Sequence, residues 1–169
     1  MRRLAPLLLS ALLFGALAGP VTAAGPSGKG AVFVPVGTYD FVITSDIGCA
    51  GFDVLVEDIS GTIKEITLPT GGTTIFHTTT RYTRTDTDVS IERSFDSIGH
   101  FLVGPDGSLD IKANGDALIW DAEPAAMGLT DGVWLIEDGK SRFAYDPEGN
   151  LVSATLLRGS TFDVCAALG

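Results

Sequence analysis

The side chains with the most chemical potential lie between Thr73 and Phe95, where polar and charged residues are concentrated in a β-prone stretch. Charged groups held on rigid strands can orient a ligand. A histidine among them can act as a general base when its neighbours tune its pKa. The candidate binding residues are His77, Arg81, Tyr82 and Arg84. Catalytic residues stay unknown at this level.

The same stretch has a second interpretation. Residues 75–84 contain no glycine or proline and are rich in β-branched threonine, so they predict a strand that is polar on both faces. A turn is expected at Asp86 to Asp88, with residues 89–95 as the returning strand. Such a strand is typical of an exposed sheet edge, where arginine deters pairing with another chain. Both interpretations, edge and binding surface, remain open.

Motifs of known enzyme classes are missing from the sequence. There is no G-x-S-x-G nucleophile elbow, no H-E-x-x-H, no phosphate loop and no dinucleotide fingerprint. The acidic pairs Asp86/Asp88 and Asp106/Asp110 are explained by turn formation and lack the glycine and distal glutamate of a calcium loop. The sequence therefore predicts no cofactor and no metal site.

The N-terminal 24 residues have the pattern of a signal peptide. Arg2 and Arg3 precede fifteen mainly apolar residues, and Thr22 and Ala24 form a cleavage site before Gly25. Fifteen residues are too few to span a bilayer, which needs about 20. We expect a secreted, monomeric mature chain without a membrane anchor. The paired arginines leave the twin-arginine route open beside general secretion.

The charge balance of the mature chain is strongly acidic. Removing residues 1–24 takes away two arginines and no acid, so the net charge moves from −10 to −12. Nucleic acid and anionic membrane surfaces are poor partners for a chain with that net charge. The partner expected is an unknown extracellular ligand or protein.

Two cysteines, Cys49 and Cys165, remain after export. An even number in an oxidising compartment predicts one disulfide, which would close nearly the whole domain. The alternative is a redox or metal pair, although no C-x-x-C spacing or flanking histidine supports it.

Strand and turn signals organise the rest of the chain. After a flexible lead at residues 25–36, a single domain at 37–169 shows about ten short strands and no helix-length periodic segment. The expected two-residue hairpin loops are Ser60-Gly61, Asn114-Gly115 and Asp138-Gly139, with proline turns at 104–108 and 146–150. The expected facing pairs are Val103/Leu109, Phe101/Ile111, Ile111/Leu118, Leu109/Trp120, Glu57/Lys64, Leu55/Ile66, Glu137/Lys140 and Trp134/Phe143.

These signals favour an all-β antiparallel meander that closes into a small barrel, and a two-sheet β-sandwich is the alternative. Gly37-Thr38-Tyr39 together with Arg158 resembles the lipocalin G-x-W and its closing arginine, but tyrosine replaces tryptophan and the strands exceed that family's eight. The segments 49–53, 104–108 and 163–169 resemble a group of small secreted actinobacterial proteins of unassigned function. That resemblance implies export and paired cysteines, and it carries over no catalytic residue.

Two functional hypotheses follow. The first, which the sequence favours, is a secreted non-catalytic module that binds a small molecule, a glycan or a protein through a barrel mouth or the 73–95 hairpin. The second is an extracellular hydrolase or isomerase in which carboxylates and His77 meet only in the fold. They differ in whether His77, Tyr82 and the two arginines lie with an acid inside a pocket.

Overall fold

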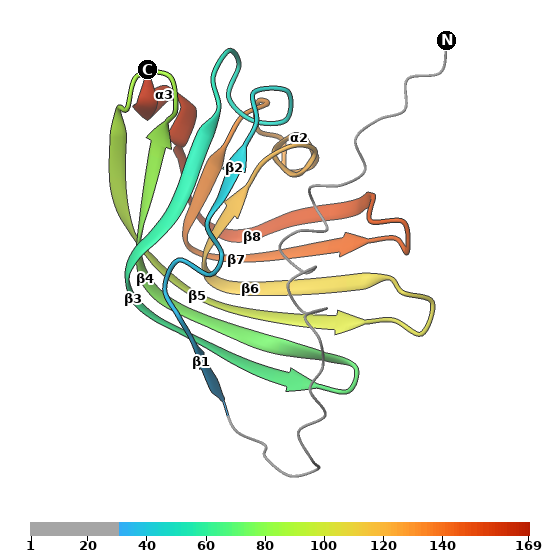
Figure 1. Ribbon diagram of the computed structural model, residues 1–169. Helices are drawn as coiled ribbons and strands as arrows, with labels where there is room; N and C mark the ends of the chain where they lie inside the picture. Colours follow the sequence, from blue (N-terminus) through green and yellow to red (C-terminus); the bar gives the residue numbers. More distant parts are fainter. Residues whose placement is uncertain (1–30) are drawn as a thin grey trace. The chain divides into compact units, whose positions relative to one another are not determined.

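Residues 31–169 are described by a computed structural model, in which they form an all-β fold with two very short helices (Figure 1). The predicted signal peptide at 1–24 and the first part of the lead lie outside the described residues. The elements are β1 (Val32–Val34), β2 (Phe41–Ile43), β3 (Val54–Leu68), β4 (Gly71–Arg84), β5 (Ser90–Val103), β6 (Leu109–Ile119), α2 (Glu123–Ala126), β7 (Trp134–Tyr145), β8 (Leu151–Asp163) and α3 (Val164–Leu168).

The eight strands form one antiparallel sheet in the order β1-β3-β4-β5-β6-β7-β8, and β2 pairs with the other half of β3. Strand β1 falls inside the predicted lead, so paired structure starts earlier than expected. Neither helix, nor any other helix within 31–169, is long and apolar enough to cross a membrane.

The sheet is not closed, so the expected closed barrel is wrong. Strand β8 pairs only with β7. Pairing of β5 with β6 runs from Val103 to Ser97 and then stops, although β5 continues back to Ser90 and β6 continues forward to Ile119. The two strands therefore separate instead of continuing to wrap around a common axis.

Three predicted hairpin loops lie in the middle of long strands. Gly61 and Gly115 do have positive φ, 116° and 96°. A Cβ at Gly61 would lie 2.1 Å from the His77 carbonyl oxygen, and one at Gly115 would lie 2.0 Å from the Asp96 oxygen. Glycine is needed at both positions because the facing backbone leaves no room for a Cβ. Both glycines lie next to irregularities in the pairing, where the strands bend. Six strands of 11 to 15 residues replace the shorter strands expected there.

The proline turns were predicted correctly. Val103 pairs with Leu109 and Phe101 with Ile111, and the turns at 86–88 and 146–150 also connect strands as expected. The registers that depended on the three glycine loops are wrong. The observed pairs are Leu109/Tyr145, Ile111/Phe143, Leu118/Leu135, Leu55/Thr83, Glu57/Arg81, Lys64/Ile75, Ile66/Thr73, Glu137/Ser160, Lys140/Arg158 and Trp134/Ile119.

The bend divides the described domain into two ends, which Figure 1 shows as strand halves running in different directions. We call them the disulfide end and the sheet end. The disulfide end comprises residues 41–59, 78–96, 116–138 and 160–168. The sheet end comprises residues 32–34, 62–77, 97–115 and 140–158.

The main core belongs to the disulfide end. Cys49 and Cys165 form the predicted disulfide across 116 residues. Around it pack buried side chains from β2, β3, β4, β7 and α3, and the Phe41 ring lies 5.4 Å from the Trp120 ring. A second cluster spans the bend, where Met127 and Leu129, which follow α2, pack beside Phe143 and its neighbours. Burial of these apolar surfaces is the main stabilising contribution to the fold.

Candidate functional site

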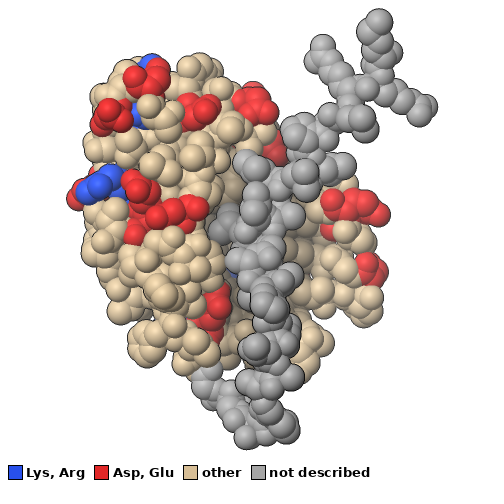
Figure 2. All heavy atoms as spheres, in the orientation of Figure 1, with Lys and Arg blue, Asp and Glu red and all other residues tan. Residues whose placement is uncertain are grey.

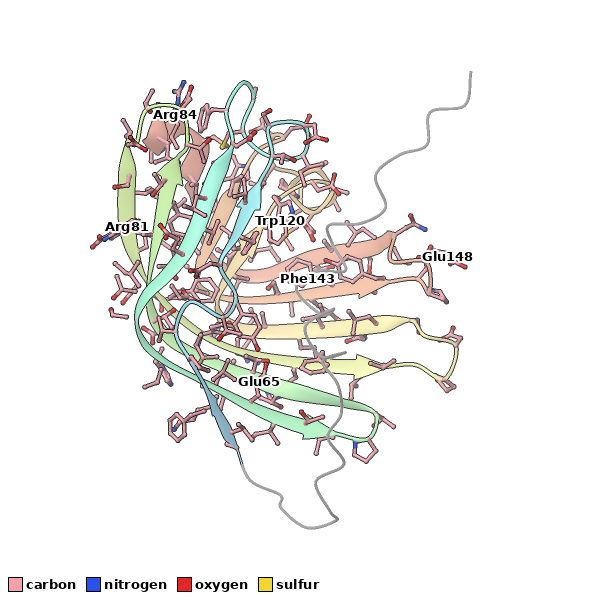
Figure 3. The ribbon with its side chains drawn as sticks, in the orientation of Figure 1. Glu65, Arg81, Arg84, Trp120, Phe143 and Glu148 are labelled. Atoms are coloured by element: carbon pink, nitrogen blue, oxygen red, sulfur yellow. A yellow bond between two sulfur atoms is a disulfide. The ribbon has the colours of Figure 1, made fainter. Side chains whose placement is uncertain are left out.

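The four predicted binding residues all lie on β4, but they do not share a face. Alternate β4 side chains point to opposite sides of the sheet. Tyr82 points inward and is fully buried, whereas His77 and Arg81 are outside. Figure 3 shows Arg81 and Arg84 projecting away from the interior position of Trp120.

His77, Arg81 and Arg84 each have an acidic neighbour. His77 Nδ1 lies 2.7 Å from Asp96 Oδ1, and Arg81 donates to Glu92 at 2.8 Å. Arg84 donates to Asp86 at 2.6 Å, and that hydrogen bond holds the pKa of Asp86 below its usual value. The pairs of His77 and Arg81 are largely solvent-exposed and contribute little to stability, whereas the Arg84 side chain is only 22% exposed and also lies over the Phe52 ring. The three pairs also leave the hairpin without a net positive surface.

Tyr82 has a different environment. Its hydroxyl is buried and has no hydrogen-bond partner among residues 31–169. Burial, with Asp58 as the next cause, raises its pKa well above the usual value. Two neighbouring hydroxyls are satisfied, because Thr78 and Thr80 both donate to Asp58 Oδ1, at 3.0 and 2.7 Å. Tyr82 is therefore a core residue of the disulfide end.

The predicted residues consequently do not meet in a pocket. An acidic surface pocket of about 230 Å³ lies beside the disulfide, lined by Asp46, Asp121, Asp131 and neighbouring backbone, and none of the four contributes to it. Within residues 31–169 no three His, Cys, Asp or Glu side chains are placed to hold a metal ion. No acid–base pair involving His77 is enclosed in the described part of the chain.

The sequence did not reveal a second group of cations, on the outward face of the sheet end. Residues that pair directly across antiparallel strands share a face. One row of partners is Phe33, Lys64, Ile75, Ile98, Asn114, Lys140 and Arg158. The next is Ile66, Thr73, His100, Lys112, Arg142 and Thr155. The third is Leu68, Gly71, Leu102, Asp110, Ala144 and Ser153. We call these three rows the outer sheet face.

Like charges lie directly opposite each other on the outer sheet face. Lys112 pairs with Arg142, and Lys140 pairs with Arg158. Directly opposed like charges destabilise a sheet. One carboxylate, Asp110, lies among them and accepts a hydrogen bond from Arg142. In the described part of the chain the other three of these cations make no ion pair.

The outer sheet face is also laterally divided. Its cations on β6, β7 and β8 form a basic half. On β1, β3 and β5 it exposes large apolar side chains, with exposed fractions of 67% for Phe33, 51% for Leu68 and 52% for Leu102, and β8 also exposes Val152 and Leu157. Lys64 lies on this apolar half, 5.0 Å from the centre of the Phe33 ring. On β6, β7 and β8 the opposite face of the sheet buries Ala113, Phe143 and Ala154.

Charge is therefore segregated in a chain whose average is acidic. The outer sheet face holds five of the eight Lys and Arg residues after residue 30, with one of the 21 Asp and Glu residues. On the view in Figure 2 the main basic patches, at the upper left, have acidic atoms directly beside them. Net charge alone could not indicate a basic surface of this kind.

Comparison with known proteins identifies no relative: no family model, no curated protein and no solved structure matches this chain. The resemblances to lipocalins and to secreted actinobacterial proteins stay predictions from short motifs.

Proposed function

We propose that this protein is a secreted, non-catalytic module that binds an anionic extracellular partner through the outer sheet face. The observation that carries the proposal is two cross-strand like-charge pairs in a chain rich in acids: Lys140 opposite Arg158, and Lys112 opposite Arg142, which also donates to Asp110. Such contacts oppose folding. An anionic partner bound across them would neutralise that repulsion, so the cations would serve to recognise the partner.

Export is supported by the signal-peptide pattern at residues 1–24 and fits the disulfide between Cys49 and Cys165. The non-catalytic part of the proposal is supported by the position of His77, whose side chain is 59% exposed and contacts Asp96 at the surface. A general base normally works inside a site that excludes water.

A negatively charged resin gives a direct test. The mature protein, although acidic overall, should be retained on a sulfonated cation exchanger at pH 7 and low salt, because the resin can contact one face alone. The Lys140→Glu/Arg158→Glu variant should flow through. The matched control is Arg81→Glu/Arg84→Glu, which changes the net charge equally but leaves the outer sheet face intact, and it should be retained.

Thermal unfolding checks that both variants are folded. Flow-through of the wild-type protein would refute the proposal. Equal loss of retention in the two variants would do the same, because it would show that net charge and not the outer sheet face governs binding.

A further inference from the structure

The outer sheet face combines two kinds of surface that a simple polyanion would not use together. Its basic half lies on β6 to β8, and its apolar half exposes Phe33, Leu68 and Leu102 on β1, β3 and β5. A sulfated or phosphorylated chain in solution would contact the cations and leave these apolar groups in water. Exposed apolar surface next to cations is typical of proteins that bind at the interface of an anionic membrane.

The face is also wide enough for an extended partner. It spans the seven consecutive strands of the sheet order, which at a spacing of about 4.8 Å gives a width of roughly 30 Å. Two of the apolar groups lie on either side of β4: Leu68 on β3 and Leu102 on β5 both flank Gly71, which has no side chain to cover them. Ile98, in the same row as Phe33 and two rows from Leu102 on β5, extends the apolar half.

The acids elsewhere in the chain would fix the orientation of such a contact. A face with a single acid, Asp110, can approach a negative surface, whereas the acid-rich remainder is repelled. At physiological salt this repulsion decays over about 8 Å, so acids on the far side of the sheet oppose binding only weakly. The argument from net charge against an anionic partner surface therefore does not apply to this face.

From these observations we propose that the partner is a lipid bilayer with anionic headgroups, on which the outer sheet face lies flat. Lys112, Lys140, Arg142 and Arg158 contact headgroup phosphates, and Phe33, Leu68 and Leu102 enter the interfacial region. This inference rests on the proposed function, because it names the anionic partner of the same surface.

Vesicle sedimentation tests the inference. The mature protein should sediment with vesicles that contain phosphatidylglycerol and stay in solution with pure phosphatidylcholine. The Leu68→Ser/Leu102→Ser variant keeps every charge, and its affinity for the anionic vesicles should fall by about tenfold or more because less apolar surface is buried. That variant should still be retained on the sulfonated resin.

Charge variants complete the design. Lys140→Glu/Arg158→Glu should lose both vesicle and resin binding, since each cation near an anionic leaflet contributes about fivefold in affinity. Arg81→Glu/Arg84→Glu should keep both. Inorganic polyphosphate, added as a soluble competitor, distinguishes a polyanion partner from a lipid surface.

The failures are distinguishable. If the wild-type protein binds resin and polyphosphate but no vesicles, or if the leucine variant binds vesicles as tightly as the wild type, the lipid inference is overturned and the proposed function stands. If the wild-type protein binds neither resin nor vesicles, both are overturned.

Discussion

At the disulfide end two of the three arginines lie beside carboxylates, whereas at the sheet end most cations lie beside one another. Arg81 and Arg84 each donate to an acid, and Arg93 stacks 4.0 Å from the Phe162 ring. Lys140 and Arg158 face each other without an acid between them. The comparison indicates that the two ends have different roles. We therefore expect stability to depend mainly on the disulfide end and, under the proposed function, binding to depend on the sheet end.

The largest expected effect comes from removing the disulfide. Replacing both cysteines, Cys49→Ser with Cys165→Ser, should lower the free energy of unfolding by about 4 kcal/mol, because the bond closes a loop of more than 100 residues in the unfolded chain. Urea unfolding measures the change. Retention on the sulfonated resin, measured where the variant is still folded, should be unchanged. Loss of retention in a folded variant would contradict the separation of roles.

Tyr82 provides an intermediate effect. Tyr82→Phe removes a buried hydroxyl that has no partner, so the free energy of unfolding should stay the same or rise by about 1 kcal/mol. Thr80→Val is the control, because it removes a hydroxyl that donates to Asp58, and it should cost about 1–2 kcal/mol. Denaturant midpoints compare the two. A clear loss of stability in Tyr82→Phe would show that its hydroxyl does have a partner.

The smallest effect is the sharpest test of the comparison. Lys140→Glu turns a like-charge pair with Arg158 into an opposite-charge pair. The free energy of unfolding should rise by about 0.5 kcal/mol, while retention on the resin weakens. Arg81→Glu instead turns an opposite-charge pair with Glu92 into a like-charge pair. The free energy of unfolding should fall by about 0.5 kcal/mol, and retention through the outer sheet face should not weaken. The same sign in both variants would mean that cross-strand charge does not distinguish the two ends.

The sequence predicted the strand content and the proline turns, because a Pro-x-Gly segment has few alternatives to a tight turn. It could not separate hairpins from bends. Gly61 and Gly115 have the positive φ that a turn requires, but their role depends on the carbonyl oxygens of His77 and Asp96 on facing strands. Those contacts are fixed by register, and a local turn signal contains no information about register.

The candidate site was missed for a related reason. Residues 73–95 attract attention because their charges are close in sequence, and nothing local shows that Glu92 and Asp86 compensate them. The cations of the outer sheet face are spread from Lys64 to Arg158, and only the pairing of seven strands brings them together. The alternation of side chains on β4 could have indicated that Tyr82 points away from Arg81.

The consecutive pairing of β3 to β8 has a consequence for how the chain acquires its structure. Each of these strands after the first pairs with the one before it, so successive hairpins can form in the order in which the chain emerges during its synthesis. Cys165, by contrast, follows the last strand, and its partner Cys49 precedes β3. The bond cannot close until the last strand has emerged. We therefore expect oxidation to be a late step that locks a meander already formed, and not one that directs its assembly.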